Sequence, residues 1–280
     1  MSIRGNSGFI DTDKRFGSSS GDTKGIIQRE QHFLERTQGR FSPSGELLPP
    51  TPTVWYDAKY VTLNGGGTNV DVWSDQSGNG ITASGNGSLN TPLYNSSDAT
   101  FGGYPSLQFD NNDRLESLDD ALLNCTNGFT IYFVTSIISF PSTFSFLAGF
   151  INSTSWTQGW GMYYYSGNWR WFVNNWNSSS TRVDMGSWSD FSNPHIFKLH
   201  YDRVNIKGEI FGTSAVAETT TSYSVAVSNP NSEGIRLGDG NSTTYQIRAK
   251  MAEMLFYNSP LSSDEQLQAE EYLKNKFNIS

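Results

Sequence analysis

The sequence predicts an all-β protein: a two-sheet antiparallel jelly-roll sandwich with a C-terminal helix and an extended N-terminal arm. Aromatic residues make up 14% of the 280 residues and glycines number 27, a composition that favours many short strands joined by tight turns. Short runs with strand periodicity follow one another from residue 54 to residue 257, separated by Asn, Gly and Ser. The first fifty residues contain too few apolar side chains to form a core of their own.

Composition excludes several classes of protein. The single cysteine, Cys125, rules out an internal disulfide framework and a multi-thiolate metal site. The net charge of −8 argues against nucleic acid as a partner, because phosphate binding needs a basic surface. We expect no membrane insertion, since no run of about eighteen apolar residues occurs. The first thirty residues also lack the apolar core of a secretory signal, so we expect synthesis and folding in a cytoplasm.

The chain changes character near residue 50, which predicts two parts. Residues 1–50 form an extended anchoring arm and hinge, and residues 51–280 form the jelly-roll domain. Two interpretations of the arm remain: it is a disordered tail, or it is a peptide that becomes ordered when it binds another protein. We favour the second, because five large apolar residues are spaced along it like anchors: Phe9, Ile10, Phe16, Phe33 and Phe41.

Strand periodicity is clearest in the middle of the chain. Residues 129–136 are apolar on both parities, as in a central strand, whereas residues 195–202 alternate and predict a half-buried strand. Residues 163–173 predict a hairpin that turns at Gly167. Further strands are expected at 70–73, 106–110, 145–150, 205–211, 234–238 and 249–257.

One helix is expected, at the end of the chain. Ser262 and Glu265 fit a capping box, in which each side chain binds the other residue's backbone amide. Ala269, Tyr272, Leu273 and Phe277 follow at helical spacing and predict one face packed on the sandwich.

Residues 156–188 hold six of the eight tryptophans and are the best candidate for ligand binding. In the predicted hairpin Trp169 and Trp171 share one strand face and Arg170 takes the other, so one face must belong to the core. Three tryptophans lie in Ser/Thr/Asn-rich loops and predict an exposed platform on which sugar rings stack. The carbohydrate-binding candidates are therefore Trp156, Trp176, Trp188 and Arg170. A protein contact surface, or six tryptophans that all fill the sandwich, are alternatives.

Several motifs in order resemble the concanavalin A-like lectin/glucanase superfamily, to which laminin-G-like domains belong. They are Trp55-Tyr56-Asp57-Ala58, Trp73-Ser74-Asp75-Gln76-Ser77-Gly78-Asn79-Gly80, Pro105-Ser106-Leu107-Gln108-Phe109-Asp110, residues 129–134, Leu237-Gly238-Asp239, residues 252–257 and the closing helix residues 272–277. The resemblance implies a jelly roll whose relatives include lectins, glycosidases and adhesion modules, so it does not define an activity. In agreement with it, we expect Trp55, Trp73 and Phe109 to be core or core-edge residues and not ligand contacts.

The resemblance bears on catalysis and on calcium. Glucanases of the superfamily use a Glu-x-Asp-x-Glu strand, which this chain lacks; Glu209 and Glu253 are single carboxylates, and we expect no enzymatic activity. Laminin-G-like domains often hold Ca²⁺, for which the candidate ligands by type and loop position are Asp75, Asp110, Asn112 and Asp239. We favour the alternative that these side chains cap turns.

The arm has a resemblance of its own. Residues 1–16 look like the N-terminal docking segments of structural proteins in tailed bacteriophages. The sequence thus predicts a non-enzymatic phage virion protein, for capsid decoration or in the tail, present in many copies. Its arm would contact other virion proteins, and its exposed lectin-like domain would bind a host-surface glycan. The alternatives are a glycan-degrading depolymerase or glycosidase of the same fold and an exported carbohydrate-binding module.

Overall fold

The computed structural model confirms an all-β antiparallel domain closed by one C-terminal helix. It describes residues 47–85, 91–110, 112–152, 155–187, 192–213, 215–230, 233–238, 245 and 247–280. The chain divides after Pro50 into Met1–Pro50 and Thr51–Ser280, and the strands and the helix belong to the second unit. The five predicted anchors, Phe9, Ile10, Phe16, Phe33 and Phe41, lie outside the described residues.

Sixteen strands, one α-helix and three short 3-10 helices make up the described part of the chain. The strands of the first half are β1 (Val54–Leu63), β2 (Val70–Asp75), β3 (Ala83–Ser84), β4 (Leu93–Asn95), β5 (Ser106–Phe109), β6 (Leu115–Ser117), β7 (Phe129–Ser139) and β8 (Phe144–Ile151). Those of the second half are β9 (Gly159–Tyr165), β10 (Asn168–Val173), β11 (Arg182–Asp184), β12 (His195–Tyr201), β13 (Asn205–Phe211), β14 (Val216–Ser222), β15 (Arg236–Leu237) and β16 (Arg248–Tyr257). The helix is α3 (Ser263–Phe277), and the 3-10 turns are η1 (Ala99–Phe101), η2 (Ala121–Leu123) and η3 (Ser179–Thr181).

The strands form two layers joined into one hydrogen-bonded path. The order is β11-β10-β9-β8-β15-β6-β3-β2-β1-β16-β7-β12-β13-β14, and β5 pairs with β16 and β4 beside it. Strand β1 pairs with β16 through Val54–Asp57 and with β2 mainly through Val61–Leu63, with a register shift between them. The predicted sandwich is therefore continuous at one corner, because a bulged strand can pass from one layer to the other.

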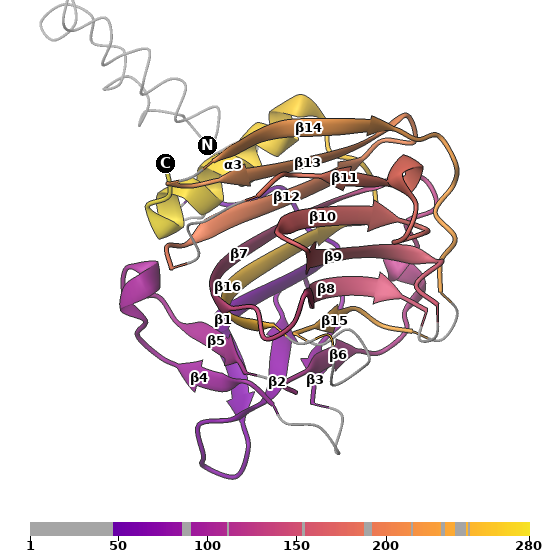
Figure 1. Ribbon diagram of the computed structural model, residues 1–280. Coiled ribbons are helices and arrows are strands. Elements are labelled where there is room, and N and C mark those ends of the chain that lie inside the picture. The colour runs from indigo at the N-terminus through magenta and orange to yellow at the C-terminus, as the bar shows by residue number, and fades with distance from the viewer. Residues whose placement is uncertain are drawn as a thin grey trace, which may run out of the picture. The chain divides into compact units, whose positions relative to one another are not determined.

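The core lies between β8–β10 on one side and β16, β7 and β12 on the other (Figure 1). Aromatic pairs bridge the layers: Trp171 stacks on Phe133 at 6.0 Å between ring centroids, and Trp169 lies 5.1 Å from Phe197. The far ends of the path also meet, since Thr221 Oγ1 of β14 donates a 2.8 Å hydrogen bond to the carbonyl of Arg182 at β11. The strands thus enclose a core rich in aromatic side chains.

The helix begins where the sequence predicted. Ser262 Oγ accepts from the amide of Glu265, and Glu265 Oε2 accepts from the amide of Ser262 at 2.9 Å, which confirms the capping box. The predicted apolar face is buried. Within the described residues, no helix has the length and apolar character needed to cross a membrane.

A buried polar network fastens α3 to the sandwich. Glu253 on β16 is fully buried and accepts 2.7 Å hydrogen bonds from Trp55 Nε1, the Tyr272 hydroxyl and Lys276 Nζ. The same ammonium group lies 2.7 Å from Asp57, which pairs in register with Glu253. Burial raises the pKa of Glu253, while the Lys276 charge opposes that rise. Three donors therefore bind the oxygens of a carboxyl group that is buried under the helix.

Replacing Lys276 by Met should lower the free energy of unfolding by about 3 to 5 kcal/mol, because Glu253 would stay buried without its counter-charge. Urea unfolding measures the change. The exposed Lys59 is the matched control, and Lys59→Met should cost less than about 0.5 kcal/mol. Adding Glu253→Gln to Lys276→Met should restore part of the loss; equal stability of Lys276→Met and wild type would contradict this account.

His200 should make stability depend on pH. It is buried on β12 with its Nδ1 at 2.9 Å from Thr130 Oγ1, and burial lowers its pKa from 6.5 to about 4. The unfolded chain binds the proton more tightly, so stability is complete above pH 6.5 and falls as the pH drops towards 4. Between pH 7 and 4.5, wild type should lose about 2 to 3 kcal/mol more than His200→Gln in urea unfolding. Equal losses would show that His200 is not the titrating group.

Candidate functional site

Strands β8, β9 and β10 bury apolar side chains on both faces. The inner face carries Trp160, Met162, Trp169 and Trp171, all in the central core. The outer face carries a second, separate cluster that contains Phe144, Phe146, Ile151, Trp156, Tyr163 and Phe172. The period of two predicted that Trp169 and Trp171 oppose Arg170, and this is confirmed: the tryptophans face the core. Three of the six clustered tryptophans therefore belong to the core.

The second cluster continues into a group of aromatic rings at the surface, which we call the outer aromatic face. It comprises Phe144, Trp156, Tyr163, Tyr165, Trp176 and Tyr245. Phe144 lies at its centre, with ring centroids 4.8 Å from Tyr163, 5.2 Å from Trp156 and 4.8 Å from Tyr245. Tyr165 and Tyr245 are each 37% exposed, so the rings are open to solvent at two edges of the face.

The segment before β9 holds Trp156 in an unusual backbone conformation. Trp156 has φ of 51°, a left-handed value that bulky side chains rarely adopt. Asn152 fixes this turn, because its Oδ1 accepts from the amides of Thr157 and Gln158 at 2.9 and 3.2 Å. Its Nδ2 donates to Ser155 at 2.8 Å. The turn directs the indole of Trp156 onto Phe144 and Phe146, where only 6% of the residue is exposed.

Trp176 lies beside Trp156 and is held by its backbone. Its amide donates to the carbonyl of Trp156 at 3.3 Å, and its carbonyl accepts from the Tyr163 hydroxyl at 2.9 Å. These bonds leave the indole to pack against Trp156 and Phe144. Phe144, Ser155, Trp156, Trp176 and Tyr245 line a hollow of about 150 Å³. The arrangement offers aromatic rings and a hydroxyl to a small ring-shaped ligand.

The platform differs from the one that the sequence predicted. Trp156 is buried beneath the exposed rings, whereas the sequence predicted it to be exposed. Trp188 lies outside the described residues. The exposed rings are Tyr165 and Tyr245, which the sequence did not predict. Alternation on β9 could have identified Tyr165, but nothing local connects Tyr245 to this surface. Its position follows from the amide of Phe146, which donates to the Tyr245 carbonyl at 3.0 Å.

Arg170 adds charge at the edge of the face. Its guanidinium carbon lies 5.0 Å from the centre of the Tyr165 ring, and its Nε lies 2.9 Å from Asp184 Oδ1. Arg182 Nε lies 3.0 Å from that same oxygen. Arg170 pairs in register with Tyr163, and burial raises the pKa of Tyr163 while the positive charges of Arg182 and Arg170 oppose this rise.

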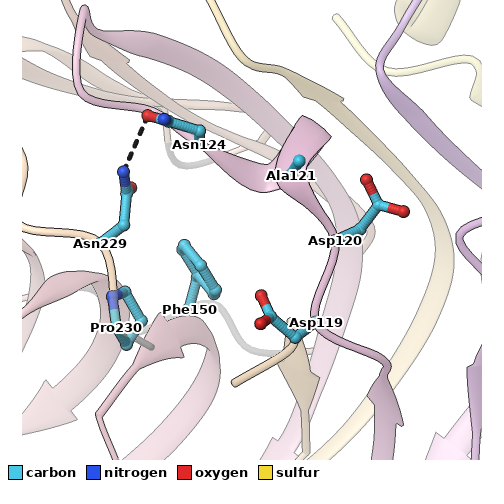
Figure 2. A pocket seen from close by; sticks show the side chains of 7 residues that line it. All are labelled: Asp119, Asp120, Ala121, Asn124, Phe150, Asn229 and Pro230. Atoms are coloured by element: carbon cyan, nitrogen blue, oxygen red, sulfur yellow. Dashed lines mark hydrogen bonds between the residues drawn. The ribbon is translucent and has the colours of Figure 1, made fainter. Parts of the chain in front are cut away.

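A larger pocket of about 450 Å³ opens between η2 and the segment that precedes β15. Figure 2 shows the carboxylate of Asp119 across from the ring of Phe150, with Asn124 and Asn229 on the opposite side. Asn229 Nδ2 donates to Asn124 Oδ1 at 2.7 Å, and Asn229 Oδ1 accepts from the amide of Cys125. The side-chain amide of Asn229 therefore stabilises the turn before β7 through these hydrogen bonds.

Two of the four calcium candidates, Asp75 and Asp110, use their carboxylate oxygens in hydrogen bonds within the protein. The oxygens of Asp75 accept hydrogen bonds from the amides of Trp55, Ser77 and Ile81, so Asp75 closes a turn. Asp110 accepts from Gln108 and Arg248 at 2.6 Å each, and Asn112 follows in the turn that Asp113 closes on the Asp110 amide at 2.7 Å. Asp239 lies outside the described residues. In the described ranges, no group of three His, Cys, Asp or Glu side chains could hold a metal ion.

The two single carboxylates that the sequence analysis considered, Glu209 and Glu253, both form ion pairs. Glu209 lies 2.9 Å from Lys198 Nζ, which also contacts Glu270 of α3. Glu253 and Asp57 form a carboxylate pair, but Lys276 lies between them and α3 covers Glu253 completely. Neither arrangement gives a substrate access to two carboxylates.

Comparison with known proteins supports the fold. No family model and no curated protein matches the sequence. The botulinum neurotoxin serotype G binding domain is similar in structure, with 13% identity, a TM-score of 0.56, and coverage of 80% of this chain and 51% of that chain. Trypanosoma rangeli sialidase with the inhibitor DANA gives 14% identity, a TM-score of 0.57, and coverage of 91% and 39%. The botulinum neurotoxin serotype D binding domain is similar too, with 13% identity, a TM-score of 0.52, and coverage of 80% of this chain and 51% of that chain.

This chain thus spans about half of each toxin binding domain and about two-fifths of the sialidase. At such identities the likeness shows a shared β-rich sandwich fold alone. The narrower resemblances, to the concanavalin A-like superfamily and to phage virion proteins, stay predictions.

Gly159 should be essential for the segment that carries Trp156. It has φ of +77°, and a Cβ there would lie 1.6 Å from the carbonyl oxygen of Phe150. Gly167 is the matched control, with φ of +90° and no atom within 4 Å of its added Cβ. Gly159→Ala should therefore cost about 2 kcal/mol or more beyond Gly167→Ala in urea unfolding. Similar losses in the two variants would contradict the close approach to β8.

Proposed function

We propose that the β domain binds glycans through the outer aromatic face and that the chain is a non-enzymatic structural protein of a bacteriophage virion. The observation that carries the glycan part is the ring cluster around Phe144, which surrounds a hollow lined by Trp156, Trp176 and Tyr245. Sugar rings stack on aromatic faces through their C–H groups, and hydroxyl and amide groups at the rim orient them. The fold also occurs in structures named as a receptor binding domain and a sialidase.

The proposed binding is not coupled to hydrolysis. Glycosidases of the common type need two accessible carboxyl groups on either side of the bond. Asp184, a carboxylate beside the outer aromatic face, forms ion pairs with Arg170 and Arg182. Bound sugars should therefore be released unchanged. The support is the chemistry of the face and the absence of a Glu-x-Asp-x-Glu strand from the sequence.

The virion part rests on the arm. Residues 1–16 resemble docking segments of tailed-phage structural proteins, and Phe9, Phe16 and Phe33 supply apolar anchors for capsid or tail proteins. In this proposal many copies are held in the particle by residues 1–50, and each presents its β domain to glycans of the host surface.

Removing ring area from the face should weaken glycan binding. On a glycan array followed by calorimetry, Trp176→Ala and Tyr245→Ala should each raise the Kd about tenfold, since one aromatic contact contributes about 1 kcal/mol or slightly more. Tyr60→Ala is the matched control, because Tyr60 is 43% exposed on β1 and is not part of the face. Unchanged Kd values for both face variants would contradict the assignment of the site.

Deleting residues 2–48 should remove the protein from virus particles and leave the β domain folded. Mass spectrometry of purified particles measures incorporation, with the full-length chain as reference. Urea unfolding and glycan binding of the shortened chain should match the full chain, because the core residues lie after residue 53. Normal incorporation of the shortened chain would contradict the anchoring role.

A further inference from the structure

Two arginines at the edge of the outer aromatic face share a single carboxylate. Arg170 on β10 pairs in register with Asp184 on β11, and Arg182 lies two residues before Asp184 on the same strand face. The Nε atoms of both arginines lie within 3.0 Å of one oxygen, Asp184 Oδ1. Arg182 makes a hydrogen bond to that oxygen, whereas the buried Nε of Arg170 has no hydrogen-bond acceptor among the described residues.

The trio carries an uncompensated positive charge. Two guanidinium groups face one carboxylate, so the formal charge of the three side chains is +1 in a protein whose overall formal charge is −8. The arginine side chains are only 13% and 17% exposed, so solvent screens this charge poorly. Asp184 is 46% exposed and is the one carboxylate that the described chain pairs with them.

This charge adjoins the rings. Arg170 lies over the ring of Tyr165. Tyr163 pairs in register with Arg170 across β9 and β10 and stacks on Phe144 at 4.8 Å between ring centroids. The ring of Tyr165 lies 5.9 Å from that of Phe144, and Arg182 pairs in register with Phe172 of the second cluster, so a ligand on the rings lies beside both arginines. A planar guanidinium binds a carboxylate through two parallel hydrogen bonds, which suits a carboxylated sugar.

We propose that the outer aromatic face selects acidic sugars, with the sugar ring on the aromatic side chains and its carboxylate on Arg170 and Arg182. This inference rests on the proposed glycan-binding function and adds the ligand class to it. Sialic and uronic acids share the required chemistry, a carboxylate attached to a pyranose ring.

Matched acidic and neutral ligands test the proposal on the full-length protein. By calorimetry at 50 mM NaCl, 3′-sialyllactose should bind at least about tenfold more tightly than lactose, or trigalacturonic acid more tightly than its methyl ester by the same factor. The preference should shrink at 500 mM NaCl, because the selective contact is ionic. Which pair shows the preference distinguishes sialic from uronic acids.

Variants assign the preference to the arginines. Arg182→Gln should weaken binding of the acidic ligand about tenfold and leave the neutral ligand unchanged, and Lys207→Gln on β13 is the charge-matched control with no effect on either. Asp184→Asn removes the counter-charge of both arginines, so it should lower stability and strengthen acidic binding in the folded variant. Thermal melting checks that each variant is folded.

The outcomes separate the two proposals. Equal affinity for acidic and neutral sugars, with weaker binding in Trp176→Ala, would overturn the inference and leave glycan binding intact. Absence of binding to every ligand would overturn both. Acidic preference that persists in Arg182→Gln and is not strengthened in Asp184→Asn would place the carboxylate elsewhere and overturn the inference.

Discussion

The structure depends on three strands, β8 to β10, that are apolar on both faces. Their inner side chains interlock with β7, β16 and β12, and burial of each large aromatic side chain contributes about 1.5 to 3 kcal/mol. Because no second sheet covers the outer side in the described chain, its rings are covered by one another and by the segments that carry Trp156, Trp176 and Tyr245. The same requirement that builds the core therefore leaves a partly exposed aromatic surface.

In the opposite layer, a buried carboxylate attaches the C-terminal helix to the strands. Helix α3 covers β1 and β16 through a carboxylate that cannot reach water, so its attachment depends on Trp55, Tyr272 and Lys276 together. The carboxylates that could have suggested catalysis are used for this attachment. The two arginines beside the outer aromatic face are different, because they share a single carboxylate and keep an excess positive charge.

Periodicity in the sequence predicted the positions of the long strands and the helix well. The half-buried strand predicted at 195–202 was wrong in burial: β12 is buried throughout, because Lys198 on its polar face is covered by ion pairs with Glu209 and with Glu270 of α3. Residues 205–211 match β13, and the capping box at Ser262 gave the start of α3. Strand β14 was missed, because Val216–Ser222 is an edge strand whose alternation is carried by threonines instead of apolar residues. The continuity of the two layers was also missed, since it depends on a register shift within β1 that no local pattern reveals.

The candidate site was predicted in part. Alternation correctly separated Arg170 from Trp169 and Trp171. Residue type alone could not show that Trp156 is buried, because that depends on a left-handed turn fixed by Asn152. Nor could it bring Tyr245, distant in sequence, next to Phe144. Loop residues are placed by tertiary contacts, and their role is visible only when the fold is known.

Side-chain NMR of the labelled protein during titration with 3′-sialyllactose tests the central claim most directly. The indole N–H signals of Trp156 and Trp176 should shift, while those of Trp160 and Trp171 in the core should not. Shifts confined to the side-chain amides of Asn124 and Asn229, with both outer indoles unchanged, would place the ligand in the other pocket and contradict the account.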